Sequence, residues 1–129
     1  MTIFSKIISG EIPCYKVAED DNFLAFLDIN PVAKGHTLVV PKKEVDYIYN
    51  LDDETLAALM LFSKKVAKAI EKVVPCNRIG ISVIGLEVPH AHMHLIPINT
   101  LDDMNFSKPR VTVAPDEYVS LAAQIAINI

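Results

Sequence analysis

The four histidines of this chain are the residues best suited to chemistry. Three of them, His90, His92 and His94, alternate with apolar residues in the run Pro89–Pro97, and the fourth is His36. Side chains alternate between the two faces of a strand, so three imidazoles spaced by two residues share one face. The intervening apolar residues then face the core. We therefore expect the imidazole face to be the working surface of the protein.

Two interpretations of this run need no covalent chemistry. The imidazoles could be hydrogen-bonded structural groups, although burying three aligned rings costs desolvation. They could also bind zinc, which takes histidine nitrogens as ligands. At a rise of about 3.3 Å per residue, His90 and His94 would lie about 13 Å apart along a straight strand, too far for one ion. A two-histidine site would need further ligands, for which His36, Glu87 and a cysteine are the candidates.

The third interpretation is nucleophilic catalysis. With an unperturbed pKa of about 6.5, imidazole is largely neutral at pH 7 and can attack phosphorus. The attack uses one ring nitrogen while an acceptor, either a backbone carbonyl or a second imidazole, holds the other N–H. Another protonated imidazole could neutralise phosphate charge or donate a proton to the leaving group. The residue types alone leave all three interpretations open.

The surrounding pattern predicts the elements that position the histidines. Thr2 is the expected N-cap of a first helix that Gly10 ends. Apolar residues at 56, 59, 60, 66, 67, 70, 73 and 74 mark one face of a long helix. The predicted helices span 3–9, 52–74 and 115–127, and the predicted strands span 14–18, 23–27, 36–41, 79–84 and 89–98. Strands with short connections and one long helix indicate an antiparallel α+β domain over residues 1–129.

Composition excludes several classes of protein. The 129 residues carry a net charge of −4, without the basic excess of a nucleic-acid-binding protein. The longest apolar run, Leu56–Phe62, is seven residues, against the roughly 20 of a membrane span. No secretory signal is recognisable at the N-terminus. Two distant cysteines, Cys14 and Cys76, suit reduced thiols in the cytoplasm.

Four blocks of sequence resemble the histidine triad (HIT) superfamily, in particular its Hint-like branch. The run His90–Ile96 matches the triad signature, in which histidines and apolar residues alternate. Residues 3–13, 23–31 and 35–42 are similar to the opening helix and the next two segments of that branch. The resemblance covers residues 3 to about 98, and residues 99–129 form a C-terminal extension without recognised motifs. It implies a HIT-like fold with a five-stranded antiparallel sheet, one long helix and short terminal helices.

The resemblance also implies an activity, namely hydrolysis or transfer at the α-phosphate of a purine nucleotide. In such proteins the middle histidine, here His92, forms a nucleotidyl-histidine intermediate that water then cleaves. His94 would contact the phosphate and assist the leaving group, His90 would orient His92, and His36 would complete the network. No cofactor is implied. Hint-like relatives further imply a homodimer in which two sheets join.

Nucleotide-binding residues follow from the same resemblance. Asp28 matches the carboxylate that accepts hydrogen bonds from the ribose hydroxyls, although it could instead form only an Asx-turn. Six residues match the apolar cleft around the base, and we expect at least two of them to serve only the core. They are Phe4, Ile7, Ile12, Phe26, Ile29 and Leu38.

The chain departs from the Hint pattern at two places. The loop before the triad is short, with Leu86 in place of a glutamine and Glu87 in place of a hydroxyl residue that would bond the phosphate or leaving group. A carboxylate repels phosphate, so turnover of the usual phosphoramidate could be weak, or Glu87 could bind an amine leaving group. Thr2 and Ser5 stand where many bacterial relatives carry a zinc-binding cysteine pair, and we expect no structural zinc.

Three hypotheses follow. The leading one is a metal-independent purine nucleoside phosphoramidase. The main rival is a nucleotide-binding protein with little or no turnover, and the third is a metal-dependent hydrolase.

Overall fold

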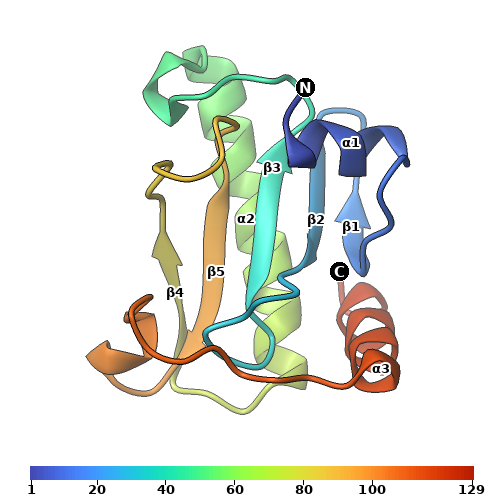
Figure 1. Ribbon diagram of the computed structural model, residues 1–129, viewed down its shortest axis with the longest axis vertical. Helices are drawn as coiled ribbons and strands as arrows, with labels where there is room; N and C mark the ends of the chain where they lie inside the picture. The colour runs from blue at the N-terminus through green and yellow to red at the C-terminus, as the bar shows by residue number, and fades with distance from the viewer.

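A five-stranded antiparallel sheet forms the centre of the protein (Figure 1). The computed structural model describes residues 1–129. The strands are β1 (Lys16–Glu19), β2 (Phe23–Leu27), β3 (Thr37–Pro41), β4 (Arg78–Ser82) and β5 (Met93–Ile98), in the spatial order β1-β2-β3-β5-β4. The helices are α1 (Ile3–Ser9), α2 (Asp53–Val73) and α3 (Pro115–Ala126), with short 3-10 helices η1 (Ile48–Asn50) and η2 (Leu101–Met104). The predicted α+β architecture is confirmed.

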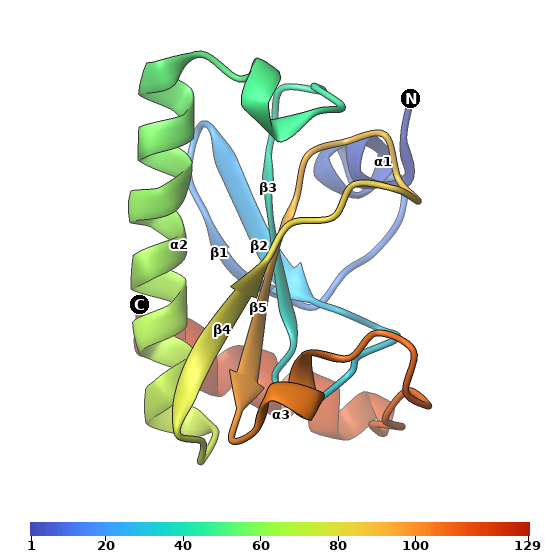
Figure 2. The same cartoon turned by 90° about the vertical axis from the view of Figure 1, so that its left-hand side faces the viewer.

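Helix α2 covers one face of the sheet (Figure 2). Asp52 caps its N-terminus by accepting a hydrogen bond from the Thr55 N–H, and Asp53 and Glu54 complement the helix dipole. Its buried side chains pack against the inward residues of the strands to form the main core. The predicted apolar face is wrong at Met60, which is 46% exposed because the buried stripe passes through Ser63 and Ala69 instead.

Helix α1 lies on the opposite face of the sheet (Figure 2). The Thr2 hydroxyl caps it by accepting from the Ser5 N–H, and Gly10 ends it in the left-handed conformation. Both ends were predicted. Phe4 packs with Leu24, Phe26, Leu38 and Val40 in a small second cluster on this face. The helix thus builds a separate apolar wall beside the sheet.

The prediction that β5 begins at Pro89 is wrong, since the strand begins at Met93. Proline has no N–H to donate to a neighbouring strand. The Ala91 N–H donates to the Val45 carbonyl rather than into the sheet. Of the three clustered histidines, only His94 therefore lies on a strand, where it pairs with Leu38. The other boundaries differ by up to two residues.

The C-terminal segment returns along the lower end of the sheet and finishes in α3 (Figures 1 and 2). Helix α3 packs on α2 and β1. The Tyr118 ring stacks on Tyr15 at 4.7 Å, and its hydroxyl donates to the Asp28 carbonyl at 2.8 Å. These contacts tie the extension to the loop that follows β2. None of the helices combines the length and apolarity needed to cross a bilayer.

At Gly35, the residue before His36, the backbone passes close to the side chains of Val74 and Pro97. Its φ is +92°, and an added Cβ would lie 2.9 Å from Val74 Cγ2 and 3.1 Å from Pro97 Cγ. Gly10 has a similar φ of +87°, but a Cβ there would meet nothing within 4 Å. An alanine at Gly10 would therefore suffer backbone strain alone, whereas an alanine at Gly35 would suffer both backbone strain and crowding.

We predict that Gly35→Ala lowers the free energy of unfolding by about 3 kcal/mol, because left-handed strain and overpacking add. Gly10→Ala, the matched control, should cost only about 1 kcal/mol from the backbone alone. Urea unfolding of the two variants measures the difference. Equal losses would contradict the crowding at Gly35.

Candidate functional site

A pocket of about 470 Å³ opens on the α1 face of the sheet. Its lining residues include members of α1, the loop between β4 and β5, the loop after β2 and the segment after η2. In Figure 2, α1 lies beside the β4–β5 loop, and the segment after η2 lies beside the loop after β2. His92 and His94 line the pocket. So do all eight residues predicted to bind a nucleotide: Phe4, Ile7, Ile12, Phe26, Asp28, Ile29, Leu38 and Glu87. All of the apolar six line the pocket, including Phe26 and Leu38, which also belong to the second cluster, and the expectation that at least two of them serve only the core stays a prediction.

The His92 ring is held with one nitrogen bonded and the other not. Its Nδ1 lies 2.7 Å from the backbone carbonyl of His90. A carbonyl only accepts hydrogen bonds, so Nδ1 carries the proton. Nε2 of the neutral ring then keeps its lone pair. Phe4 packs against the ring edge-on, with centroids 4.9 Å apart. The arrangement leaves a fixed, unprotonated nitrogen on a side chain that lines the pocket.

His36 and His94 form a second chain of hydrogen bonds. The Val32 N–H donates to His36 Nδ1 at 3.1 Å, so the proton of His36 lies on Nε2. That Nε2 lies 2.9 Å from His94 Nδ1 and donates to it. The neutral His94 must therefore carry its own proton on Nε2. His36 is buried and does not line the pocket, and its hydrogen bond to His94 connects it to the lining residues.

The His90 side chain is buried beneath the pocket and does not line it. Its Nε2 donates to the Pro41 carbonyl at 2.8 Å, and its Nδ1 lies 2.9 Å from Thr2 Oγ1. The backbone carbonyl of His90, not its imidazole, bonds His92. The imidazole anchors the turn whose carbonyl orients the neighbouring ring.

The environment of Thr2 and Ser5 does not fit zinc. Zinc sites use thiolates, imidazoles and carboxylates, whereas these positions supply hydroxyls. The groups around them already bond one another: the Ser5 hydroxyl and the Thr2 N–H both donate to Glu44 Oε1, and Thr2 Oγ1 bonds His90. A hydrogen-bonded network of hydroxyls, a carboxylate and an imidazole therefore occupies these two positions.

Burial keeps the pocket imidazoles neutral. It lowers the pKa of His36 to about 3, with a smaller contribution from the Arg110 guanidinium. Burial, followed by the neighbouring His36 and His92, lowers the pKa of His94 to about 3. The pKa of His92 is also lowered, mainly by burial. At neutral pH these rings therefore keep the proton positions that their hydrogen bonds define.

Asp28 has two separate roles in the structure. Its Oδ1 accepts from the Asn30 N–H at 2.8 Å, which is the Asx-turn anticipated as an alternative. Its Oδ2 lies 3.5 Å from His36 Nε2. Asp28, His36 and His94 are the one group of potential metal ligands, with ligand atoms within 4.8 Å of one another. One nitrogen of each histidine in that group, His36 Nε2 and His94 Nδ1, is engaged in the hydrogen bond between the two rings.

Two lining residues from the C-terminal extension were not predicted. Phe106 packs edge-on against His94 with ring centroids 4.9 Å apart, and the Arg110 Cζ lies 5.4 Å from the Phe106 ring centroid. No motif covers this region. The sequence shows only an isolated aromatic residue and a cation in an irregular segment after the last strand. This pattern does not predict that the two side chains line the pocket.

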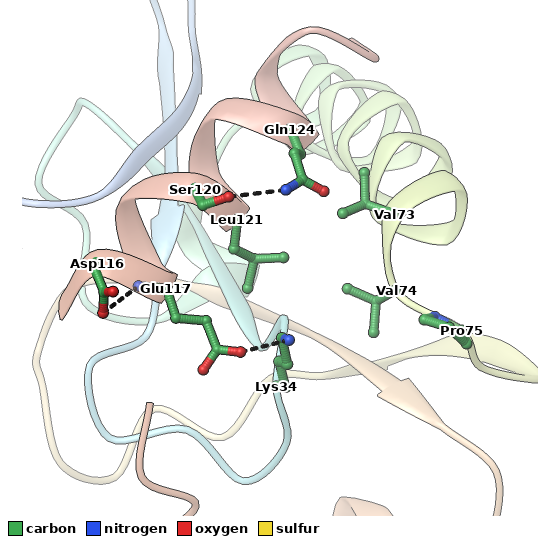
Figure 3. A pocket seen from close by; sticks show the side chains of 9 residues that line it. All are labelled: Lys34, Val73, Val74, Pro75, Asp116, Glu117, Ser120, Leu121 and Gln124. Carbon is green, nitrogen blue, oxygen red and sulfur yellow. Dashed lines mark hydrogen bonds and ion pairs between the residues drawn. The ribbon is translucent and has the colours of Figure 1, made fainter. Parts of the chain in front are cut away.

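A second hollow of about 360 Å³ lies between the end of α2 and the start of α3 (Figure 3). Lys34 Nζ and Glu117 Oε2 form an ion pair across it at 2.6 Å. It contains no histidine or cysteine. The histidines that line a pocket are therefore confined to the first one, which contains His92 and His94.

Comparison with known sequences identifies relatives over most of the chain. The HIT domain family matches residues 9–101. The adenosine 5'-monophosphoramidase of Schizosaccharomyces pombe is 38% identical over 130 residues, covering 98% of this chain and 97% of that protein. An uncharacterized HIT-like protein of Borreliella burgdorferi is 38% identical over 135 residues, with 98% and 97% covered.

Solved structures share the fold. A HIT-like protein from Bartonella henselae, described as involved in cell-cycle regulation and crystallised with an unknown ligand, superposes with a TM-score of 0.85 and 32% identity. The match covers 99% of this chain and 96% of that one. A zinc-bound histidine triad family protein from Mycobacterium smegmatis gives a TM-score of 0.82 at 27% identity, with 98% and 91% covered.

We predict that the unfolding free energy falls as the pH drops from 7 to 5. The folded pKa values of His36 and His94 are about 3, whereas an unfolded histidine titrates at about 6.5, so protonation favours unfolding. The slope should approach about 1.4 kcal/mol per pH unit for each ring that stays neutral. Urea unfolding measures it above the range where carboxylates titrate. Unchanged stability, with NMR titration midpoints near 6.5 for these rings, would contradict the assignment.

Proposed function

Because this chain belongs to the HIT domain family, we propose that it is a nucleotide hydrolase acting at the α-phosphate. Its preferred substrate would be a purine nucleoside phosphoramidate, whose P–N bond it cleaves to release a monophosphate. The name and 38% identity of the S. pombe adenosine 5'-monophosphoramidase support this choice. So does a pocket that combines apolar walls, two carboxylates and two imidazoles.

One observation carries the proposal: the 2.7 Å bond from His92 Nδ1 to the His90 carbonyl. It directs the lone pair to Nε2, the atom that would attack phosphorus. In the first step the Nε2–P bond forms and the P–N bond breaks. The bonding pair leaves with the amine nitrogen. The proton stays on Nδ1, hydrogen-bonded to the His90 carbonyl, and this hydrogen bond stabilises the positive charge that develops on the ring.

His94 would handle the proton of the leaving group. Its Nε2 carries the proton because Nδ1 accepts from His36. To act as an acid His94 must first take a second proton on Nδ1, which displaces the hydrogen bond accepted there from His36, and a bound phosphate anion beside the ring raises its pKa toward that state. It then protonates the departing amine. In the second step water attacks phosphorus, gives a proton to His94, and releases His92 and the monophosphate.

The nucleoside would occupy the rest of the pocket. Asp28 Oδ2 is not used by the Asx-turn and can accept from ribose hydroxyls. The apolar walls, including Phe4 on α1 and Phe26 on β2, suit the faces of a purine base. Every residue of this assignment lines the same pocket.

Glu87 favours the rival, a nucleotide-binding protein with little turnover. It lines the pocket on the loop before His90, where its charge opposes that of a phosphate. Tight binding without release would be the result that separates this rival from the hydrolase. An amine leaving group, in contrast, would be attracted to Glu87.

We further propose that the protein is a cytoplasmic homodimer, that residues 1–129 act as one domain, and that the reaction needs no metal. Strand β4 is an edge of the sheet, and Ile81, Val83 and Ile84 on and after it are exposed, which suits sheet-to-sheet pairing. Metal independence is supported by the hydrogen bond between His36 Nε2 and His94 Nδ1, which occupies one nitrogen of each histidine in the one group of potential ligands.

The native chain should release AMP from an adenosine phosphoramidate through many turnovers in EDTA, and His92→Ala should lower the rate by at least about 10³-fold. General acid–base assistance alone contributes about 10²–10⁴-fold, and this change also removes the nucleophile. The assay is AMP release followed by chromatography. Full activity of His92→Ala would exclude the covalent route, and inhibition by EDTA would favour the metal-dependent hydrolase.

A further inference from the structure

The extension after β5 brings a cation to the pocket. Residues 99–114 run from the end of β5 through η2 and past the loop that precedes β3 (Figure 2). The Val111 N–H donates to the Pro31 carbonyl at 2.9 Å, which fixes this segment to that loop. Arg110, its neighbour, is half-buried and lines the pocket.

Neutral groups hold the Arg110 guanidinium. Its Nη1 donates to the Asn30 carbonyl at 3.2 Å, and its Cζ lies 5.4 Å from the centroid of the Phe106 ring. Phe106 in turn packs edge-on against His94. No carboxylate forms an ion pair with Arg110. The side chain is positioned, but its charge is not neutralised by the protein.

Arg110 is the one permanently positive side chain that lines the pocket. Among the 21 lining residues, Asp28 and Glu87 are acidic and Arg110 is the one lysine or arginine. His92 and His94 are neutral at pH 7, as argued above. A nucleotide phosphate entering the pocket would therefore meet two negative charges and a single fixed positive one.

We propose that Arg110 binds the phosphate group of the nucleotide and thereby makes the pocket select nucleotides over nucleosides. The inference rests on the proposed function for the identity of the ligand. The guanidinium presents a planar fork of N–H groups that matches two phosphate oxygens, and it stays charged at all working pH values. The Arg110 guanidinium lies over Phe106, and Phe106 packs against His94, the imidazole that would serve the leaving group.

The alternative is that Arg110 only tethers the extension to Asn30. Two variants separate the roles. Arg110→Gln keeps an N–H donor for the Asn30 carbonyl but removes the charge, and Arg110→Lys keeps the charge but loses the fork. Lys108→Gln is the matched control, because Lys108 lies two residues away, pairs with Asp102 and does not line the pocket.

The test is calorimetric titration of the four full-length proteins with AMP and with adenosine. We expect the native chain to bind AMP more tightly than adenosine. Arg110→Gln should weaken AMP binding about tenfold or more, as loss of a charge-assisted bond implies, and leave adenosine binding unchanged. Arg110→Lys should fall between the native chain and Arg110→Gln, and Lys108→Gln should match the native chain.

Equal weakening of AMP and adenosine would reduce Arg110 to a tether, and unchanged AMP binding would remove its contact with phosphate. Native binding of AMP no tighter than adenosine would also overturn the proposal. These outcomes are distinct from failure of the hydrolase. If the chain cleaves the phosphoramidate and AMP binding does not depend on Arg110, the proposed hydrolase stands and the phosphate site at Arg110 falls. If AMP binding depends on Arg110 but the phosphoramidate is not cleaved, the phosphate site stands and the hydrolase falls.

Discussion

Burial of the imidazoles is the constraint on which the rest of the site depends. A buried charged ring loses its hydration, so His36, His92 and His94 favour the neutral form. A neutral imidazole has one donor and one acceptor nitrogen, and each hydrogen-bond partner then decides which is which. The His90 carbonyl makes Nδ1 of His92 the donor. No buried side-chain nitrogen or oxygen is left without a partner, which keeps this assignment unambiguous.

Elements on both faces of the sheet contribute to the burial of the imidazoles. Helix α2 seals one face with the main core, and the residues between the histidines belong to that core. Helix α1 supplies Phe4 beside His92 and the Thr2 hydroxyl beneath His90. The pocket is therefore the part of the second face that α1 does not fill. Its walls are apolar while its chemistry comes from a few fixed polar groups, as is usual for small-molecule sites.

Much of this could be predicted from sequence where the signal is local. The helix caps at Thr2 and Asp52 and the period of α2 are local patterns, and the structure follows them closely except at Met60. The alternation around the histidines holds only in part, because His90 lies before β5 and does not line the pocket. The start of β5 could not be predicted, because it depends on Ala91 bonding Val45 across the fold. The positions of Phe106 and Arg110 depend on the path of an irregular segment, and an irregular segment has no sequence periodicity from which its path could be predicted. A backbone carbonyl was one of the two acceptors expected for the His92 N–H, but the sequence could not show that the carbonyl of His90, and not its imidazole, fills that place.

The central claim is that His92 Nε2 forms a bond to phosphorus. Rapid quenching of the native chain with an adenosine phosphoramidate, followed by mass spectrometry of peptides under conditions that preserve acid-labile phosphorus–nitrogen bonds, tests it most directly. We predict one adenylyl group per chain during turnover, attached to His92 and absent from His92→Ala. Steady release of AMP with no adduct at any time, and inversion of configuration at phosphorus, would contradict the account.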